Sequence, residues 1–502
     1  MKTNYLFMKS GVFAAFFFIF AIQLNAQQNY KLSEYVNPNY FYHSLGFTAN
    51  LNANGNLTYS KLDNSSWFKN NTSSFGGNFG ISYYQIKNTA RYQGTQNVRI
   101  YYNGGLSKTF SSDHYSPADN STSTQKYNNF NTEFDYSSTN RFYNSRKQFL
   151  EIVPEIVLGF QGFRHTSDYN PITYPFNSKN LTKSNNVSFG LSFMVGTDRI
   201  ENVENARLAI YILNDLQKSG DVKKDLSNAQ VDQLARFITK LRNKRFFDSR
   251  IRNIASVTSI DSLLTSMGIR EHSGASYFMI LNDDWNYANG PIRQSGHRFA
   301  FGVTPGYSNN HVKMTRDDIL NSSSPSSSQT ISTNKAQLST FDIGAYYYLE
   351  KPVNLTWQHS TIVSLGYELE KQVNNNSTDP VQSSDYKTTV YDPNLHLSLE
   401  RIYGYYPSSR TNLALDFKIS GLYSMENQKD TTEMKNNQLK LSASVFLKGN
   451  YYFSPQLRLN LNAGVSDNYQ HLDNNIGTSM HVMNRTNSWY PSIGLSLSYN
   501  IF

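Results

Sequence analysis

The feature that most constrains this chain is a strict alternation of apolar and polar residues over long segments. Within 439–447 and 457–465 every second residue is apolar, with Lys440 and Arg458 among the polar positions, and residues 413–419 and 187–195 repeat the pattern. Neighbouring side chains of a β-strand point to opposite faces, so each segment has one apolar face and one polar face. A soluble β-sandwich also alternates. However, most of these segments exceed the roughly 9–11 residues that a tilted strand needs to cross a bilayer, whereas globular strands have about five or six.

The connections between these segments alternate between short and long. Short turns are predicted around Lys351-Pro352, Pro407-Ser408 and Ser454-Pro455, each after a cluster of aromatic residues; long polar loops are predicted over 321–333, 373–384, 425–437 and 468–487. Such Ser- and Asn-rich stretches are otherwise typical of flexible linkers. Turns at one end and loops at the other favour a transmembrane barrel, with the aromatic clusters at one membrane interface. Counting gives six strands before residue 197 and eight after residue 297, about 14 in all, which puts both termini at the periplasmic end.

The first residues have the layout of a secretory leader. Lys2 and Lys9 precede a short apolar core, Gly11 to Ile22, and Ala26 precedes the expected cleavage point. The apolar core is shorter than the about 20 residues of a membrane-spanning helix. We therefore expect residues 1–26 to be a signal peptide that is removed on export.

Composition agrees with an exported barrel and excludes some alternatives. The chain has 36 Tyr and 32 Phe, a mean hydropathy of −0.54 and no cysteine, so no disulfide and no lipidated thiol can form. Tyr suits membrane interfaces because its ring is apolar and its hydroxyl can stay hydrated. The net charge of +9 becomes 44 − 37 = +7 without Lys2 and Lys9, which does not indicate nucleic-acid binding.

The C-terminal segment 493–502 resembles the terminal strand that the barrel-assembly machinery recognises, although Phe502 is one position out of phase with the alternating apolar residues. On this segment and the strand pattern, the mature chain resembles Gram-negative outer-membrane β-barrel proteins. The resemblance implies a location in the cell outer membrane, with outer-membrane lipid and the barrel-assembly machinery as partners. The predicted fold is an all-β transmembrane antiparallel barrel of about 14 strands with a small α-helical inserted domain. The barrel would comprise residues 27–196 and 297–502, and the insert residues 197–296.

Within the insert the apolar period changes from 2 to 3.6 residues, which predicts helices. The first runs along Val203 to Leu213 and stops at Gly220; the second runs along Val231 to Leu241 with Ser227 or Asp225 as its cap. A short third helix is predicted over 260–267, capped by Thr258 or Ser259 and ended by Gly268. The insert follows an even-numbered strand, so we expect it on the periplasmic side.

A basic stretch in the insert suggests a docking surface for an acidic periplasmic protein, peptidoglycan or anionic lipid. Its cations are Arg236, Lys240, Arg242, Lys244, Arg245, Arg250 and Arg252. The alternative is a solvated face whose cations pair with Glu201, Glu204 and Asp215 on the first helix. The phrases RIENVENAR and LRNKRFFDSR resemble segments of uncharacterised barrel proteins, a resemblance that implies no activity.

No catalytic, phosphate-binding or metal-ligand motif is present, so we expect no enzyme activity, no cofactor and no metal. Asn282-Asp283-Asp284 lacks the spaced ligands of a calcium loop and is interpreted as a loop turn or helix cap. Strand phase predicts that charged residues of both signs line the lumen: Arg99, Glu133, Glu151, Glu155, Asp342, Glu368, Glu400 with His396 beside it, Asp416, Lys418, Lys440, Lys448 and Arg458.

Three classes of function remain open. The first is a structural or partner-docking barrel that acts through its periplasmic insert. The second is a porin-like channel or transporter for small solutes, because a barrel of this size can enclose water or a plug. A barrel-embedded hydrolase is a distant third.

Overall fold

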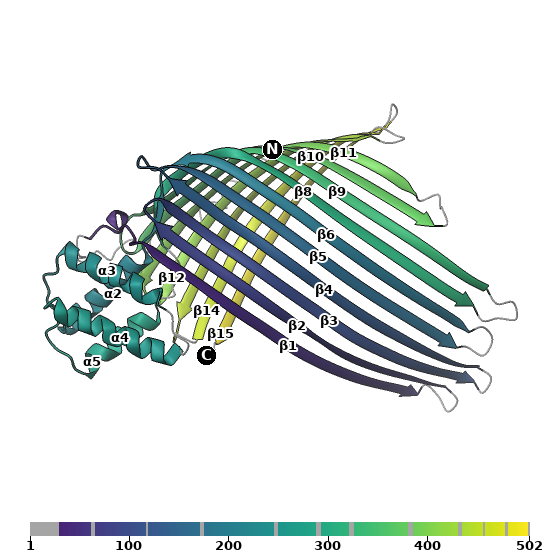
Figure 1. Cartoon of the computed structure of the whole chain (residues 1–502), viewed down its shortest axis with the longest axis horizontal. Coiled ribbons are helices and arrows are strands. Elements are labelled where there is room, and N and C mark those ends of the chain that lie inside the picture. Colours follow the sequence, from purple (N-terminus) through teal and green to yellow (C-terminus); the bar gives the residue numbers. More distant parts are fainter. Residues whose placement is uncertain are drawn as a thin grey trace, which may run out of the picture.

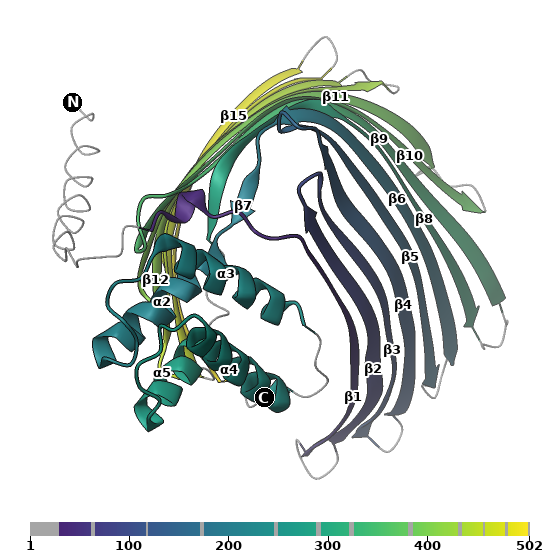
Figure 2. The same cartoon turned by 60° about the vertical axis from the view of Figure 1, so that its left-hand side comes forward.

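The fold is a single curved antiparallel sheet with a group of helices at one end (Figures 1 and 2). A computed structural model describes residues 30–61, 66–116, 119–170, 175–244, 249–287, 293–320, 326–379, 385–429, 434–454, 457–476 and 480–499. The predicted signal peptide, Arg245 and the terminal Phe502 lie outside these residues. No helix in the described part of the chain is long and apolar enough to cross a membrane.

Consecutive strands pair with one another along a continuous path, with one short extra strand beside it. The first strands are β1 (Tyr40–Lys61), β2 (Trp67–Thr89), β3 (Tyr92–Ser116), β4 (Asp119–Tyr143), β5 (Gln148–Asn170) and β6 (Phe176–Thr197); the short strand β7 (Ile200–Asn202) pairs with β8. The path continues with β8 (Gln294–Leu320), β9 (Ser326–Pro352), β10 (Trp357–Asp379), β11 (Tyr386–Ser408), β12 (Thr411–Lys429), β13 (Met434–Tyr452), β14 (Leu457–Ile476) and β15 (Met480–Tyr499).

This path confirms the predicted barrel wall of six strands before the insert and eight after it. Its order is β1 to β6 and then β8 to β15, every neighbouring pair being antiparallel. Among the described residues no pairing joins β1 to β15, so these two strands form the ends of the hydrogen-bonded path.

The strands are longer than the sequence indicates. The segments 321–333, 373–384, 425–437 and 468–487, predicted as loops, are largely strand where they are described: β9 begins at Ser326 and β10 continues to Asp379. Ser, Thr and Asn are weak strand formers, yet here each backbone is hydrogen bonded to neighbours on both sides. Pairing in the ladder therefore overrides local propensity, and the polar part of the wall extends beyond the apolar band.

Among the described residues, four helices lie between β7 and β8: α2 (Glu204–Ser219), α3 (Asn228–Arg242), α4 (Ser249–Ser266) and α5 (Ala275–Asn286). The first ends at Gly220, whose φ of 82° is left-handed and suits glycine. Ser227 caps α3 in a reciprocal capping box with Gln230. The third helix begins at Ser249, about three turns before the predicted 260–267, and α5 was not predicted.

The helices share one apolar core with the segment that precedes β1. The side chains of Ile212, Leu213, Leu234 and Ile238 are fully buried there. Leu32, in the short 3-10 helix η2 (Leu32–Glu34), and Tyr35 join the same core, and the Tyr35 hydroxyl lies 3.1 Å from Oγ1 of Thr239. Figure 2 shows the helices inside the curve of the sheet, at the end where its short turns lie.

Candidate functional site: the inner face and the insert

Strand register divides the wall into an outer apolar face and an inner polar face. Residues directly opposite each other on paired strands point to the same side, and Phe75 faces Leu106 while Phe134 faces Ile100. Side chains in this phase are widely exposed, with Leu106 at 55% and Val195 at 59%. The opposite phase contains Gln358, which accepts a hydrogen bond from Arg293 of the insert, and Tyr406, whose ring lies 5.6 Å from the guanidinium carbon of Arg207 on α2. The charged residues predicted for the lumen all lie in this inner phase.

Many of the inner charged residues form pairs between strands. Arg99 Nε donates to Asp135 at 2.8 Å, and Lys448 Nζ lies 2.8 Å from Asp416. The remaining pairs are Arg99 with Glu133 at 3.5 Å, Lys418 with Glu400 at 3.8 Å, and His396 with Asp342 at 3.9 Å. In the described part of the chain Glu155, Glu368, Lys440 and Arg458 form no ion pair, and Arg458 instead contacts Tyr452. The inner face is thus charged but largely neutralised pair by pair.

The most buried inner group is centred on Glu151, near the insert. Its carboxylate pairs with Arg141 and accepts a 2.9 Å hydrogen bond from the Tyr346 hydroxyl. The guanidinium of Arg298 lies 5.5 Å from the Tyr346 ring and 5.0 Å from the Tyr348 ring. Tyr346 and Tyr348 therefore face inward, which corrects the prediction that their whole aromatic cluster lies at the membrane interface. Consecutive strand residues alternate, so three aromatic neighbours cannot all face lipid.

One arginine fixes the end of the insert to the β9–β10 turn. Arg293 is fully buried; its Nε donates to Oε1 of Gln358 at 3.0 Å, and its Nη2 donates to the carbonyls of Asn354 and Trp357 at 2.8 and 2.9 Å. The Tyr406 ring lies 4.9 Å from its guanidinium carbon. Burial, with the nearby charge of Arg207, lowers the pKa of Arg293 to about 10. Arg293 was not predicted, because its partners are mainly backbone carbonyls about 60 residues away.

Two further arginines tie the insert to other turns at the same end of the wall. Arg199 donates to the Thr89 carbonyl at 2.8 Å and to Oδ1 of Asn88 at 2.7 Å, beside the β2–β3 turn. Arg410, in the β11–β12 turn, pairs with Asp283 of α5 and lies 4.6 Å from the Tyr287 ring. The insert therefore has anchor points spread around the end of the wall.

A hollow of about 400 Å³ lies between this end of the wall and the start of the insert. Its lining combines residues of β7 with inner side chains of the barrel, including Glu201, Arg141, Arg298, Glu350 and Gln93. Gln93 also donates to the Ile200 carbonyl at 3.1 Å, so β7 forms one wall of the hollow. Charged groups of both signs thus face the space beneath the insert.

The predicted basic docking residues do not form one open surface. Arg236 pairs with Asp232 at 2.6 Å, and Arg242 donates to Oδ1 of Asn205 at 2.7 Å. Arg252 donates to the Arg242 carbonyl at 3.1 Å. Lys240 and Lys244 are exposed, whereas Arg245 and the side chain of Arg250 are outside the described residues.

The acidic residues offered as alternative partners pair elsewhere. Glu201 pairs with Arg199, Glu204 with Arg207, and Asp215 with Lys218. Part of the stretch therefore holds the insert together, because Arg242 and Arg252 donate to other residues of the insert.

The exposed apolar side chains of the insert gather on α4 and α5. Ile254 is 63% exposed, Met279 is 72% exposed and Phe278 is 40% exposed. A hydrogen bond of 2.9 Å from Asn253 to Asn282 joins the two helices beside them. We call Ile254, Phe278 and Met279 the insert patch.

The acidic motif 282–284 lies inside α5, which corrects its interpretation as a loop turn or cap. Asp284 is buried, and burial together with the charges of Asp215 and Asp283 raises its pKa to about 7. Its Oδ2 has no hydrogen-bond partner among the described residues. In that part of the chain no three His, Asp or Glu side chains converge as a metal site.

Comparisons with known proteins give no relative in sequence. No protein-family profile matches the chain, and no curated protein matches it. The translocator domain of autotransporter NalP from Neisseria meningitidis is similar at 9% identity and a TM-score of 0.21, covering 82% of this chain and 90% of that one. The β-domain of the Bordetella autotransporter BrkA has 6% identity and a TM-score of 0.17, covering 76% and 96%. The TodX monoaromatic hydrocarbon channel has 10% identity and a TM-score of 0.20, covering 94% and 92%.

The strand order, the outward apolar face and the inward charged face together define the architecture. The chain has the fold of an outer-membrane β-barrel protein with a helical insert between its sixth and seventh wall strands.

Proposed function

We propose that this barrel holds its helical insert in the periplasm as a docking module for a periplasmic protein. The observation that carries the proposal is the insert patch. Among the described residues of the four helices, Ile254, Phe278 and Met279 are the large apolar side chains that remain widely exposed. Exposed apolar side chains on two neighbouring helices of a folded domain favour protein association.

The chemistry of the patch favours a protein over peptidoglycan. Aromatic and Met side chains are enriched at protein interfaces, and the unbranched thioether of Met279 can adapt to an apolar partner surface. A glycan strand would instead call for a groove rich in polar groups. The partner that fits is a periplasmic protein that offers an apolar helix face or pocket.

The way in which the insert is attached to the barrel wall supports the same role. Arg199, Arg293 and Arg410 connect it to three separate turns of the wall. A module held at several points keeps a fixed orientation, which lowers the entropy lost when a partner binds.

Photo-crosslinking in cells tests the proposal. A benzoyl-phenylalanine at Met279 should give one discrete adduct, whereas the same probe at Ser262, an exposed residue elsewhere on α4, should not. The adduct would be identified by mass spectrometry, and binding of the purified partner to the full-length protein would then be measured in detergent.

Matched variants separate the insert patch from the basic stretch. Met279→Asp and Ile254→Asp should each raise the Kd at least tenfold, as expected for central interface residues, and Lys240→Ala should leave it unchanged. A Kd that responds to Lys240→Ala and not to the patch variants would contradict the proposal.

A solute channel is the second candidate, and the charged inner face favours it. Groups of both signs line the wall and the 400 Å³ hollow under the insert, as in pores that tune ion passage. Purified protein in planar bilayers should then show discrete open-state conductance steps. The absence of conductance steps in this assay, combined with a specific crosslink at Met279, would favour docking alone.

Catalysis is not part of either proposal. The hydrolase alternative would be revived by turnover of ester or peptide substrates by the purified protein.

A further inference from the structure

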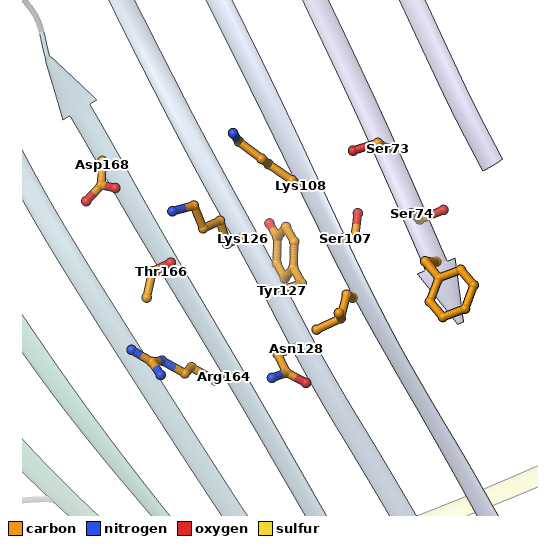
Figure 3. Close-up of a pocket in the computed structure, with 12 residues that line it drawn as sticks. Ser73, Ser74, Ser107, Lys108, Lys126, Tyr127, Asn128, Arg164, Thr166 and Asp168 are labelled. Carbon is orange, nitrogen blue, oxygen red and sulfur yellow. The ribbon is translucent and has the colours of Figure 1, made fainter. Parts of the chain in front are cut away.

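A group of cations lies on the outer, lipid-side face of the barrel, near the loop end of strands β3 to β8. We call Lys108, Lys126, Arg164, Lys179, Lys183 and Lys313 the outer cation cluster. All six side chains are exposed. Figure 3 shows Lys108, Lys126 and Arg164 on three adjacent strands, around a hollow of about 680 Å³ that Thr166 and Asp168 also line.

Register places these cations on the outer face. Lys108 lies opposite Lys126, two residues along from Leu106 opposite Asn128, in the phase of the exposed apolar residues. Lys183 lies opposite Lys313 in the phase of Val187 and Phe189. The inner residues of the same strands, such as Arg99 and Glu151, have the other phase.

The cluster begins where the continuous apolar band of the outer face ends, although Phe110 and Leu181 follow in the same phase. On β3 the outer side chains change from Leu106 to Lys108, and on β4 from Phe130 to Lys126, with Asn128 between. On β6 they change from Val187 to Lys183, with Asn185 between. Each change runs away from the insert end, so the cations border the band on the loop side, where headgroups of the outer leaflet would lie.

Few acidic side chains lie near the outer cation cluster to neutralise it. Lys179 lies 3.9 Å from Asp317, whereas in the described part of the chain Lys108, Lys126, Arg164, Lys183 and Lys313 form no ion pair. Among the described residues, Asp168 is the one acidic side chain that lines the hollow. Moreover, Lys108 and Lys126 are directly opposite, as are Lys183 and Lys313, and like charges in that relation destabilise a sheet.

An anion shared by neighbouring strands would remove this repulsion. A phosphate group has several oxygens that can accept charge-assisted hydrogen bonds from Lys and Arg at once. Directly beneath the cations, Phe75 and Leu106 are 56% and 55% exposed and could contact acyl chains. A cationic row above an apolar surface matches a molecule with phosphates above several acyl chains.

We propose that the outer cation cluster binds the phosphate groups of an outer-leaflet glycolipid, with its acyl chains against Phe75, Leu106 and Phe130. Phosphates bridge Lys108 and Lys126 on one side and Lys183 and Lys313 on the other. Arg164, on the strand between them, is available to both. The bound lipid thus tethers the first half of the wall to the outer leaflet.

Lipid retention by the purified full-length protein tests this site. Diphosphoryl lipid A would be added in detergent, and bound copies counted by native mass spectrometry, with the same lipid stripped of its phosphates as comparison. The double variant Lys108→Gln and Lys126→Gln should lower the affinity about tenfold or more. The matched control is Lys371→Gln with Lys387→Gln, cations in the same outer phase of β10 and β11.

The outcomes distinguish phosphate-dependent lipid binding at this cluster from nonspecific adsorption to the barrel. Retention should fall as ionic strength rises, because exposed charges are screened. Equal binding of the phosphate-free lipid, an equal loss in the control pair, or complete displacement by inorganic phosphate at constant ionic strength would each overturn the proposal. A melting temperature of the double variant that stays the same, or that rises because the Lys108–Lys126 repulsion is removed, shows that the loss reflects binding and not unfolding.

Discussion

The guanidinium of Arg293, at the end of the helical insert, donates from Nε to Oε1 of Gln358 on β10 at 3.0 Å, and no part of its side chain is exposed. This contact joins the insert to a strand that lies 65 residues further along the chain. It also places a positive charge where several carbonyl oxygens of one turn converge.

The first prediction concerns this charge. Arg293→Met should lower the free energy of insert opening by about 2–4 kcal/mol, because carbonyls of Asn354 and Trp357 lose a buried donor. Since the chain has no cysteine, a cysteine at the buried position Val231 reports opening through its rate of thiol labelling. Arg236→Met, at an exposed ion pair, is the control and should change the value by less than about 1 kcal/mol. Equal effects would contradict an anchoring role.

The second prediction concerns pH. The pKa of Asp284 is about 7 in the folded insert and 3.8 ordinarily, so the folded state holds a proton that the unfolded chain has already released. Insert stability should therefore be full below about pH 4 and fall as pH rises towards 7, by at most about 4 kcal/mol. Asp284→Asn should remove most of this slope and be the more stable form at pH 8. The same Val231→Cys labelling measures it, and identical slopes for both proteins would refute the assignment.

The third prediction separates the core of the insert from its patch. Leu234 is fully buried in the shared core, and Leu234→Ala should cost about 2–5 kcal/mol of opening free energy. Met279→Ala, at an exposed side chain, should cost less than about 0.5 kcal/mol. Labelling of Val231→Cys again gives both values. A large cost at Met279 would mean that this side chain packs within the insert and is not free to dock.

The fourth prediction applies if the barrel conducts. Asp416 and Lys448 form a 2.8 Å pair on the inner face, so Asp416→Asn leaves an unbalanced cation there. The reversal potential under a salt gradient should shift towards anion selectivity, and Lys448→Gln should shift it the opposite way. Substituting Lys371, on the outer face of β10, should leave the reversal potential unchanged. Identical shifts for both inner variants would contradict opposite roles in one pore.

The alternation of apolar and polar residues was enough to predict most strands of the wall. The places where this prediction fails have physical causes. Residues such as Leu441 and Ile493 follow the pattern because one face of each strand meets lipid. Beyond the membrane both faces can be wet, so the pattern fades while the hydrogen-bonded ladder continues. Ser326 and Asp379 illustrate this, because both lie in strands with nothing in their side chains to indicate it.

In the insert, too, the sequence predicts some features and not others. Gly220 and Ser227 mark helix ends through local backbone geometry, which sequence can express. Helix α5 buries only Tyr277, Leu281 and Trp285 in a clear i, i+4, i+8 stripe beside Asp284, and that stripe was the available signal. The roles of Arg199 and Arg293 depend on carbonyls brought close by the fold, so no pattern near either residue could reveal them.

The long polar ladders have a consequence for what can reach the cell surface. Strand β8 has 27 residues, a contour of about 90 Å at 3.3 Å per residue, against a hydrocarbon layer of about 30 Å. Even when tilted, a wall of this length would extend well beyond the hydrocarbon layer as a rigid polar rim. With the loop end outward in an outer membrane, a large particle approaching the cell would contact this rim before the apolar band.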